Sequence, residues 1–169
     1  MLIVIAGERC TGKSALARAI MDKIHADFFA GRDYVRLAPT EPEAVDRFQL
    51  LLAEKQHSED YVIFLLTEPD LFALVPPGSF VVMCRSRLET SKARFARQMP
   101  DGELSPSIAA MLERQRGSFD HIPHSLTLDT DGADLSLLAV EVLDNLKNKS
   151  EEGSVLIEFV VLLFNKLEV

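Results

Sequence analysis

The sequence predicts an α/β fold in which a five-stranded, mainly parallel sheet has helices on both faces. Short apolar runs alternate along the chain with segments whose apolar residues recur every three or four positions. Each run is continuously apolar, which is typical of strands buried on both faces of a parallel sheet. Strands joined through helices in this way form a three-layer architecture. The length of 169 residues suits one domain with a short appendage.

The elements follow from these two periodicities and from their boundary residues. The first apolar run, LIVIA, ends at Gly7, and the run near 27–37 is broken at Gly31. Thr40, with Glu43 three residues later, is a capping signal for a helix start. The expected strands are 2–6, one within 27–37, 61–66, 80–84 and 125–128. The expected helices are 13–24, 40–56, a short one after 66, then 88–98, 107–116 and 133–147.

Composition excludes several classes of protein. A hydrophobic share of 47% argues against disorder, and a formal net charge of -8 argues against a general nucleic-acid binder. Two cysteines, with no Cys/His cluster, are too few for a disulfide framework or a zinc site. The N-terminus lacks the pattern of a signal peptide, and no apolar stretch approaches the ~20 residues of a membrane span. We therefore expect a cytoplasmic protein without membrane contact.

The end of the chain differs in character from the rest. After a polar stretch at 147–153, the segment 154–164 is apolar at every position except its first residue and Glu158. This segment is too short to span a membrane. It is expected either to pack on the core as an extra strand or helix, or to form an interface with a second copy of the chain. The expected organisation is a domain at 1–149 followed by a tail at 150–169, with a homodimer as one outcome.

The most specific signal is a phosphate-binding loop near the N-terminus. The segment GERCTGKS matches the pattern G-x-x-x-x-G-K-[ST] between a buried strand and a helix. Glycine lets the backbone curl so that its N–H groups point at phosphate oxygens, and the helix start adds positive charge. Lys13 is expected to reach the β- and γ-phosphates, and Ser14 to hold Mg²⁺. The predicted nucleotide-binding residues of this segment are Gly7, Glu8, Arg9, Cys10, Thr11, Gly12, Lys13, Ser14 and Ala15.

A basic segment follows the fourth expected strand. Five basic residues lie within 85–97 of an otherwise acidic chain. On a helix, Arg87, Arg94 and Arg97 fall within about a quarter-turn of one another. Arginine suits the charge on a phosphoryl group in transfer, although an ordinary solvated helix face gives the same pattern. The polar segment near 99–106, between two helices, is a candidate lid.

On these residues the chain resembles the small P-loop kinases, the group that includes shikimate, gluconate and nucleoside monophosphate kinases. The resemblance covers about residues 1–147: the phosphate loop, the arginine-bearing helix, the short lid, and the strand that runs into 128–131. It implies the P-loop NTPase fold, ATP with Mg²⁺, and transfer of the γ-phosphate to a small acceptor. It also implies that Arg94 and Arg97 contact ATP or the moving phosphate, and that the loop 130–134, with Asp131, borders the adenine.

The chain departs from that family at two acidic positions. Near the end of the second strand, Asp33 stands where an Asp-x-Asp pair is usual. It is a candidate to orient the acceptor hydroxyl or to hold Mg²⁺ through water, and otherwise a turn residue. Glu68 stands where the third strand usually ends in Asp, and it either replaces that residue or caps the next helical turn. Arg32 or Arg36 is expected to bind an anionic group on the acceptor.

Three functions are compatible with these residues. The leading one is a small-molecule kinase, in which Lys13, Asp33, Arg94 and Arg97 are catalytic. The acceptor would be a nucleoside monophosphate, a sugar acid or a shikimate-like molecule, bound by Arg32, Asp33, Arg36 and Glu68. A nucleotide-binding regulatory module with little turnover is the second function, favoured by the weak acidic motifs. The third is an NTP hydrolase, in which water is the acceptor.

Overall fold

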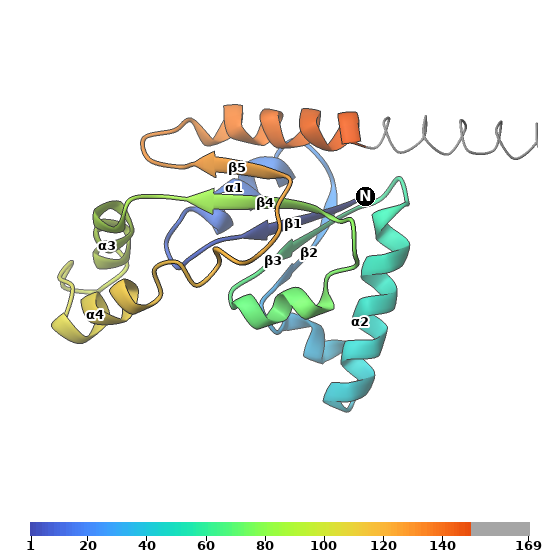
Figure 1. The fold of residues 1–169 in the computed structure, drawn as a ribbon, viewed down its shortest axis with the longest axis horizontal. Coiled ribbons are helices and arrows are strands. Elements are labelled where there is room, and N and C mark those ends of the chain that lie inside the picture. Colours follow the sequence, from blue (N-terminus) through green and yellow to red (C-terminus); the bar gives the residue numbers. More distant parts are fainter. Residues whose placement is uncertain (150–169) are drawn as a thin grey trace, which may run out of the picture.

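Five parallel strands form a single sheet in the computed structural model, which describes residues 1–149 (Figure 1). Their order across the sheet is β2-β3-β1-β4-β5. The predicted five-stranded parallel sheet is therefore confirmed. The expectations for the tail at 150–169 fall outside the described residues. The strands are β1 (Leu2–Ala6), β2 (Ala26–Ala30), β3 (Tyr61–Leu65), β4 (Phe80–Arg85) and β5 (Leu126–Asp129).

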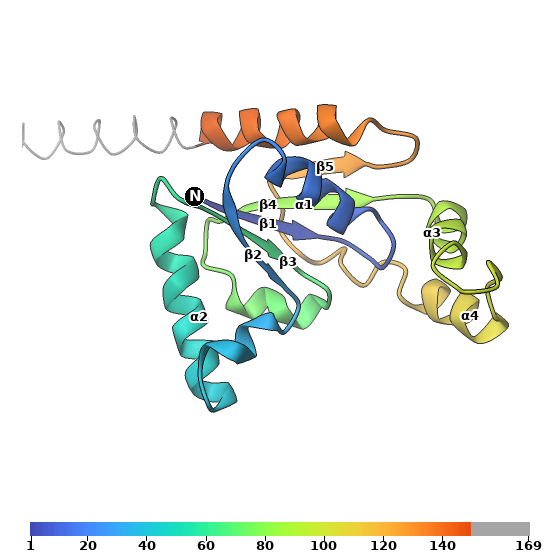
Figure 2. The same cartoon turned by 180° about the vertical axis from the view of Figure 1, so that it is seen from behind.

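Helices cover both faces of this sheet, as Figures 1 and 2 show from opposite sides. Two 3₁₀ helices, Asp33–Leu37 and Pro69–Leu74, follow β2 and β3. A further helix begins at residue 135 and is described to residue 149. Within 1–149, no helix combines the length and the apolar character that crossing a membrane requires. The other helices are α1 (Lys13–Met21), α2 (Glu41–Gln56), α3 (Leu88–Ala96) and α4 (Pro106–Arg114).

Alternation of side chains along the central strand gives the sheet two apolar faces. Ile3 and Ile5 point to the face covered by α1 and the C-terminal helix. Leu2, Val4 and Ala6 point to the opposite face, which α2 covers. All five residues of β1 are buried because strands pair with both of its edges and helices cover both faces of the sheet. This burial on both sides explains why the strand is continuously apolar in sequence.

The face under α2 is built around one aromatic side chain. Phe48 of α2 is fully buried. Its ring stacks on Tyr34 at 5.3 Å and meets Phe64 of β3 edge-on at 4.9 Å. The ring of Phe29 in β2 lies 5.1 Å away at a tilt. Aromatic pairs in these geometries add to the free energy of burial. Phe48 therefore fixes α2 and the 3₁₀ helix that contains Tyr34 against the sheet.

The observed elements match the predicted ones in kind and differ at their ends. Helix α1 ends at Met21, three residues before the predicted end, where the backbone turns at Asp22 and Lys23. The strand expected within 27–37 occupies only Ala26–Ala30. The chain then turns at Gly31, where φ is 54°, and continues as a 3₁₀ helix. Periodicity identifies a core-facing segment, but helix ends depend on local turns that periodicity does not report.

The topology determines where a ligand can bind. From β1 the chain crosses to β2 at one edge of the sheet, whereas β4 is followed by β5 at the other edge. The connections that leave the adjacent strands β1 and β4 therefore run toward opposite edges of the sheet. In open parallel sheets such a divergence leaves a crevice beyond the carboxyl ends of the strands. The predicted phosphate loop follows β1, and the arginine-bearing helix α3 follows β4, so both lie at this crevice.

We expect Phe48→Ala to lower the free energy of unfolding by about 3–5 kcal/mol, since it leaves a cavity among three aromatic rings. Leu50→Ala is the matched control in the same helix because the Leu50 side chain is 62% exposed. Its effect should stay within about 0.5 kcal/mol. Chemical denaturation of the two variants, followed by circular dichroism, measures both values. Equal losses in the two variants would contradict the role given to Phe48.

Candidate functional site

The loop between β1 and α1 has a backbone that few residues can adopt. The φ angles of Gly7, Cys10 and Gly12 are 140°, 61° and 89°. A β-carbon on Gly7 would collide with the carbonyl oxygen of Cys84, and one on Gly12 would lie 3.2 Å from Thr130 Oγ1. Glycine at these two positions thus lets the loop curl tightly against the ends of β4 and β5. The motif predicted from the sequence has the strand–loop–helix setting it requires.

Lys13 is the buried cation of this loop. Its Nζ donates hydrogen bonds to the carbonyl oxygens of Gly7 and Glu8, each at 2.7 Å, and lies 5.9 Å from the centre of the Phe119 ring. The residue is only 8% exposed. Burial lowers the pKa of Lys13 to about 8, because the charged form has lost most of its water. An anion placed beside Nζ would restore favourable interactions to this ammonium group.

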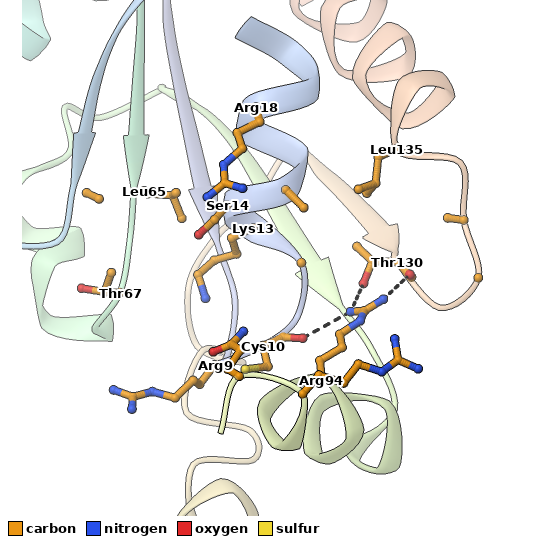
Figure 3. Close-up of a pocket in the computed structure, with 17 residues that line it drawn as sticks. Arg9, Cys10, Lys13, Ser14, Arg18, Leu65, Thr67, Arg94, Thr130 and Leu135 are labelled. Carbon is orange, nitrogen blue, oxygen red and sulfur yellow. Dashed lines mark hydrogen bonds between the residues drawn. The ribbon is translucent and has the colours of Figure 1, made fainter. Parts of the chain in front are cut away.

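Arg94 of α3 and Thr130, the residue after β5, tie the loop to its surroundings (Figure 3). One guanidinium nitrogen of Arg94 donates to Thr130 Oγ1 at 2.9 Å and to the Cys10 carbonyl at 3.2 Å. The other donates to the Thr130 carbonyl at 2.6 Å. Thr130 Oγ1 in turn donates to the Thr11 carbonyl at 2.8 Å. Segments far apart in sequence are thereby held together around the phosphate loop.

A cavity of about 730 Å³ opens above this loop. The phosphate loop and α1 form its floor, and Ala30, Leu65 and Thr67 form the wall at the ends of β2 and β3. The opposite wall comes from α3 and from the residues that follow β5 (Figure 3). A cavity of this size is typical of small-molecule sites. The remaining lining residues are Arg9, Cys10, Gly12, Lys13, Ser14, Ala15, Arg18, Arg94, Arg97, Gln98, Thr130, Gly132, Ala133 and Leu135.

The cavity is strongly basic although the chain carries a net charge of -8. Five of its lining side chains are cationic: Arg9, Lys13, Arg18, Arg94 and Arg97. Among the described residues that line it, none is Asp or Glu. In the part of the chain that the structure describes, Arg9, Arg18 and Arg97 make no hydrogen bond or ion pair through their side chains. Their unpaired guanidinium groups favour a ligand with several negative charges.

Ser14 is the residue that fits a magnesium ion. It is exposed at the start of α1 and lines the cavity beside Lys13. Its hydroxyl is an oxygen ligand of the kind Mg²⁺ prefers, and Mg²⁺ is commonly held by one or two protein oxygens together with phosphates. Within residues 1–149, no group of three or more His, Cys, Asp or Glu side chains is placed to hold a metal ion by itself. The donor set therefore fits an ion that enters with a phosphorylated ligand.

The predicted acceptor residues lie outside the cavity lining. Asp33 Oδ2 accepts a hydrogen bond from the Ala30 N–H at 3.0 Å and lies 3.8 Å from the Arg36 guanidinium. Arg32 pairs with Glu41 at 3.0 Å and with Glu68 at 3.9 Å. All four predicted residues are brought together beside the wall that contains Ala30 and Thr67. Arg32 and Arg36 already have carboxylate partners there.

The two acidic side chains of the predicted nucleotide-binding set are occupied by protein contacts. The Glu8 carboxylate accepts from Arg116 at 3.0 Å and from the Gly117 N–H at 2.6 Å. Asp131 Oδ2 accepts from the backbone N–H of Arg87 at 2.9 Å and from its Nε at 2.8 Å. The backbone N–H bond of Arg87 lowers the pKa of the Asp131 carboxyl. Asp131 thus holds the start of α3, whereas its neighbours Thr130 and Gly132 line the cavity.

Among the polar cavity residues, sequence reasoning missed Arg18 and Thr67, whereas Thr130 belongs to the loop 130–134 that the resemblance placed beside the adenine. Arg18 stands four residues after Ser14 on α1, and this spacing places the two on one helix face. That signal was available in the sequence. Thr67 lies two residues after the end of β3, and Thr130 directly follows β5. Residues just beyond the carboxyl ends of parallel strands are the usual place for ligand contacts, although nothing in the identity of a threonine indicates that role.

Comparison with known proteins identifies the fold. No protein-family model and no curated protein sequence matches this chain. Solved structures do match. A gluconokinase from Sinorhizobium meliloti 1021 is 18% identical, with a TM-score of 0.59 over 90% of this chain and 95% of that one. A shikimate kinase from Acinetobacter baumannii, solved with shikimate, is 15% identical, with a TM-score of 0.55 over 87% and 93%.

A deoxyadenosine kinase from M. mycoides matches in the same way. It is 14% identical, with a TM-score of 0.52 over 88% of this chain and 99% of that one. The three matches cover 87–90% of this chain and 93–99% of the other chains. At these identities the likeness concerns the fold. The chain therefore has the α/β fold of the small P-loop kinases, as its sequence predicts.

Proposed function

We propose that this protein is an ATP-dependent phosphotransferase that moves the γ-phosphate of ATP·Mg to a small-molecule acceptor. The observation that carries the proposal is the phosphate loop opening into a cavity with five cationic side chains and, among its described lining residues, no carboxylate. Nucleoside triphosphates are polyanions, and the fold is shared with kinases. Positive charge around the phosphates is the main requirement of phosphoryl transfer.

The residues on the floor of the cavity bind the triphosphate in this proposal. Lys13 exchanges its carbonyl partners for oxygens of the β- and γ-phosphates. The Ser14 hydroxyl holds Mg²⁺, which neutralises charge on those phosphates when it is bound. Arg97 is free to approach the moving phosphoryl group. Arg94 acts from its fixed position against Thr130 and Cys10, where it adds positive charge without a further conformational change.

The transfer itself needs a correctly placed acceptor. An acceptor oxygen forms a bond to the γ-phosphorus while the bond to the β–γ bridging oxygen breaks, which releases ADP. The proton of the acceptor hydroxyl passes to a base, and Asp33 is the proposed one. The hydrogen bond that its carboxylate accepts from the N–H of Ala30, a residue that lines the cavity, supports this proposal.

The acceptor is proposed to be an anion, such as a nucleoside monophosphate or a sugar acid. Arg32 and Arg36 are already paired with carboxylates, which makes them less available to bind the acceptor. Arg9 is exposed and unpaired within residues 1–149. In Figure 3 its side chain extends away from Arg94, so the two guanidinium groups serve different parts of the site. We propose Arg9 as an additional contact for the anionic group of the acceptor.

One observation favours a second candidate function, a nucleotide-binding regulatory module with little turnover. Such a module needs the phosphate loop and the arginines, but it needs no base. The cavity has this composition, because none of its described lining residues is acidic. The two candidates therefore differ in whether Asp33 reaches the acceptor, and they agree on the binding of ATP.

The first test measures ADP release from ATP·Mg²⁺ with and without nucleosides, nucleoside monophosphates, sugar acids and shikimate. We expect release to rise with one anionic acceptor and to be lost in Lys13→Ala. Asp33→Asn should lower kcat by about 10²-fold or more if Asp33 is the base. Binding of ATP without release in any mixture would contradict the kinase and support the regulatory module.

The pH dependence of ATP binding tests the role of Lys13. With a pKa of about 8, Lys13 of the free protein is half deprotonated near pH 8, whereas a bound phosphate favours the protonated form. ATP affinity should therefore fall as pH rises above about 8, and a change of one pH unit approaches tenfold there. Calorimetric titration between pH 7 and 9.5 measures it. Lys13→Arg should remove this step, and a wild-type affinity that is flat across pH 8–9.5 would contradict the assignment.

A further inference from the structure

The side chain of Glu8 is anchored by the turn that follows α4. Both carboxylate oxygens are used: Oε2 accepts from Arg116 at 3.0 Å and Oε1 from the Gly117 N–H at 2.6 Å. The Glu8 side chain is only 9% exposed. The same Arg116 nitrogen also donates to the Ser86 carbonyl at 2.7 Å. A buried carboxylate with a charged partner and a backbone donor is costly to disturb, so this contact holds the loop firmly.

The main chain of Glu8 is linked to Lys13. Its carbonyl oxygen accepts from Lys13 Nζ at 2.7 Å and from Thr11 Oγ1 at 2.8 Å. The turn after α4 also approaches Lys13 directly, through the ring of Phe119 at 5.9 Å. The side chain and the main chain of Glu8 thus make different contacts. Its carboxylate binds the turn at 116–117, and its carbonyl helps to position the ammonium group of Lys13, which lines the cavity.

That turn is the exit of the helical hairpin formed by α3 and α4. Helix α3 carries Arg94 and Arg97, and the expected lid near 99–106 joins it to α4 (Figure 2). Lys92 of α3 pairs with Glu113 of α4 at 2.8 Å, which holds the two helices together. Arg116 lies two residues after the end of α4, so a movement of the hairpin would displace it. The hairpin and the phosphate loop therefore meet at the Glu8–Arg116 pair.

We propose that Arg116, acting through Glu8, is a positioning residue that sets the phosphate loop for nucleotide binding and couples it to the α3–α4 hairpin. The proposal rests on the proposed function in taking ATP·Mg as the ligand of the loop. Arg116 itself does not line the cavity. Its effect on the ligand is indirect, through the carbonyl of Glu8 and the placement of Lys13.

The test compares Arg116→Gln, Glu8→Gln, the double variant and the conservative Arg116→Lys. The matched control is Glu113→Gln, which breaks the exposed pair between α3 and α4 without touching the loop. Calorimetry gives the Kd for ATP·Mg, thermal melting gives the stability, and hydrogen exchange by mass spectrometry follows the backbone of residues 7–14. Arg116→Gln and Glu8→Gln should each bind ATP between about tenfold and a hundredfold more weakly, the scale of a small misplacement.

Coupling between the two residues is the decisive result. The double variant should bind ATP no more weakly than the weaker single variant, since both changes break one interaction. Arg116→Lys should recover most of the affinity, and hydrogen exchange at 7–14 should quicken in Arg116→Gln but not in the control. A merely structural role would lower thermal stability and leave ATP affinity equal to that of Glu113→Gln, and this result would overturn the proposal. Additive losses of affinity would overturn it too.

Failure of the proposed function gives a different pattern. If the wild-type protein does not bind ATP·Mg, the proposed function fails, and hydrogen exchange then decides the positioning role. Faster exchange at 7–14 in Arg116→Gln than in Glu113→Gln still supports a link between the turn and the loop. Equal exchange in the two variants overturns it.

Discussion

The hydrogen bonds from Lys13 to the carbonyl groups of Gly7 and Glu8 are the interaction on which the site depends. They close the loop on itself and keep a cation buried at its centre. Two carbonyl oxygens and the face of Phe119 only partly offset the loss of water, because the pKa of Lys13 remains lowered to about 8. An anion beside Nζ would therefore stabilise this loop. The sheet makes this possible by presenting the loop at the carboxyl end of its central strand.

The distribution of arginine partners separates binding from scaffolding. Arg32, Arg85 and Arg87 are each paired with a carboxylate at the surface. Around the cavity the pattern reverses, because Arg9, Arg18 and Arg97 have no side-chain partner within residues 1–149. An acidic chain that leaves these guanidinium groups unpaired in one cavity creates a local positive potential there. This contrast points to an anion-binding site more sharply than net charge does, since net charge alone argues only against a general nucleic-acid binder.

Sequence reasoning reached the parts of the structure that depend on local pattern. The apolar runs and the four-residue spacing gave the strands, the helices and the parallel sheet, and one motif gave the phosphate loop with Lys13 and Ser14. Contacts between distant segments were out of reach. The pair formed by Glu8 and Arg116 joins residues 108 positions apart, so no local pattern reports it. The motif placed Glu8 beside phosphate as a loop member, but a motif does not say which way a side chain points.

The proposed binding of nucleotide and the proposed transfer of phosphate depend on different parts of the structure. The groups proposed to hold the triphosphate follow β1 and β4, and they are tied to the end of β5 through Thr130 and Arg94. The proposed base, Asp33, sits instead on a short 3₁₀ helix after β2, and its carboxylate is held by the backbone at Ala30. In the proposed function, affinity for nucleotide would thus come from groups anchored to the sheet, whereas turnover would depend on a segment outside it. Because the two depend on different elements, binding of ATP by this fold does not by itself imply transfer of its phosphate.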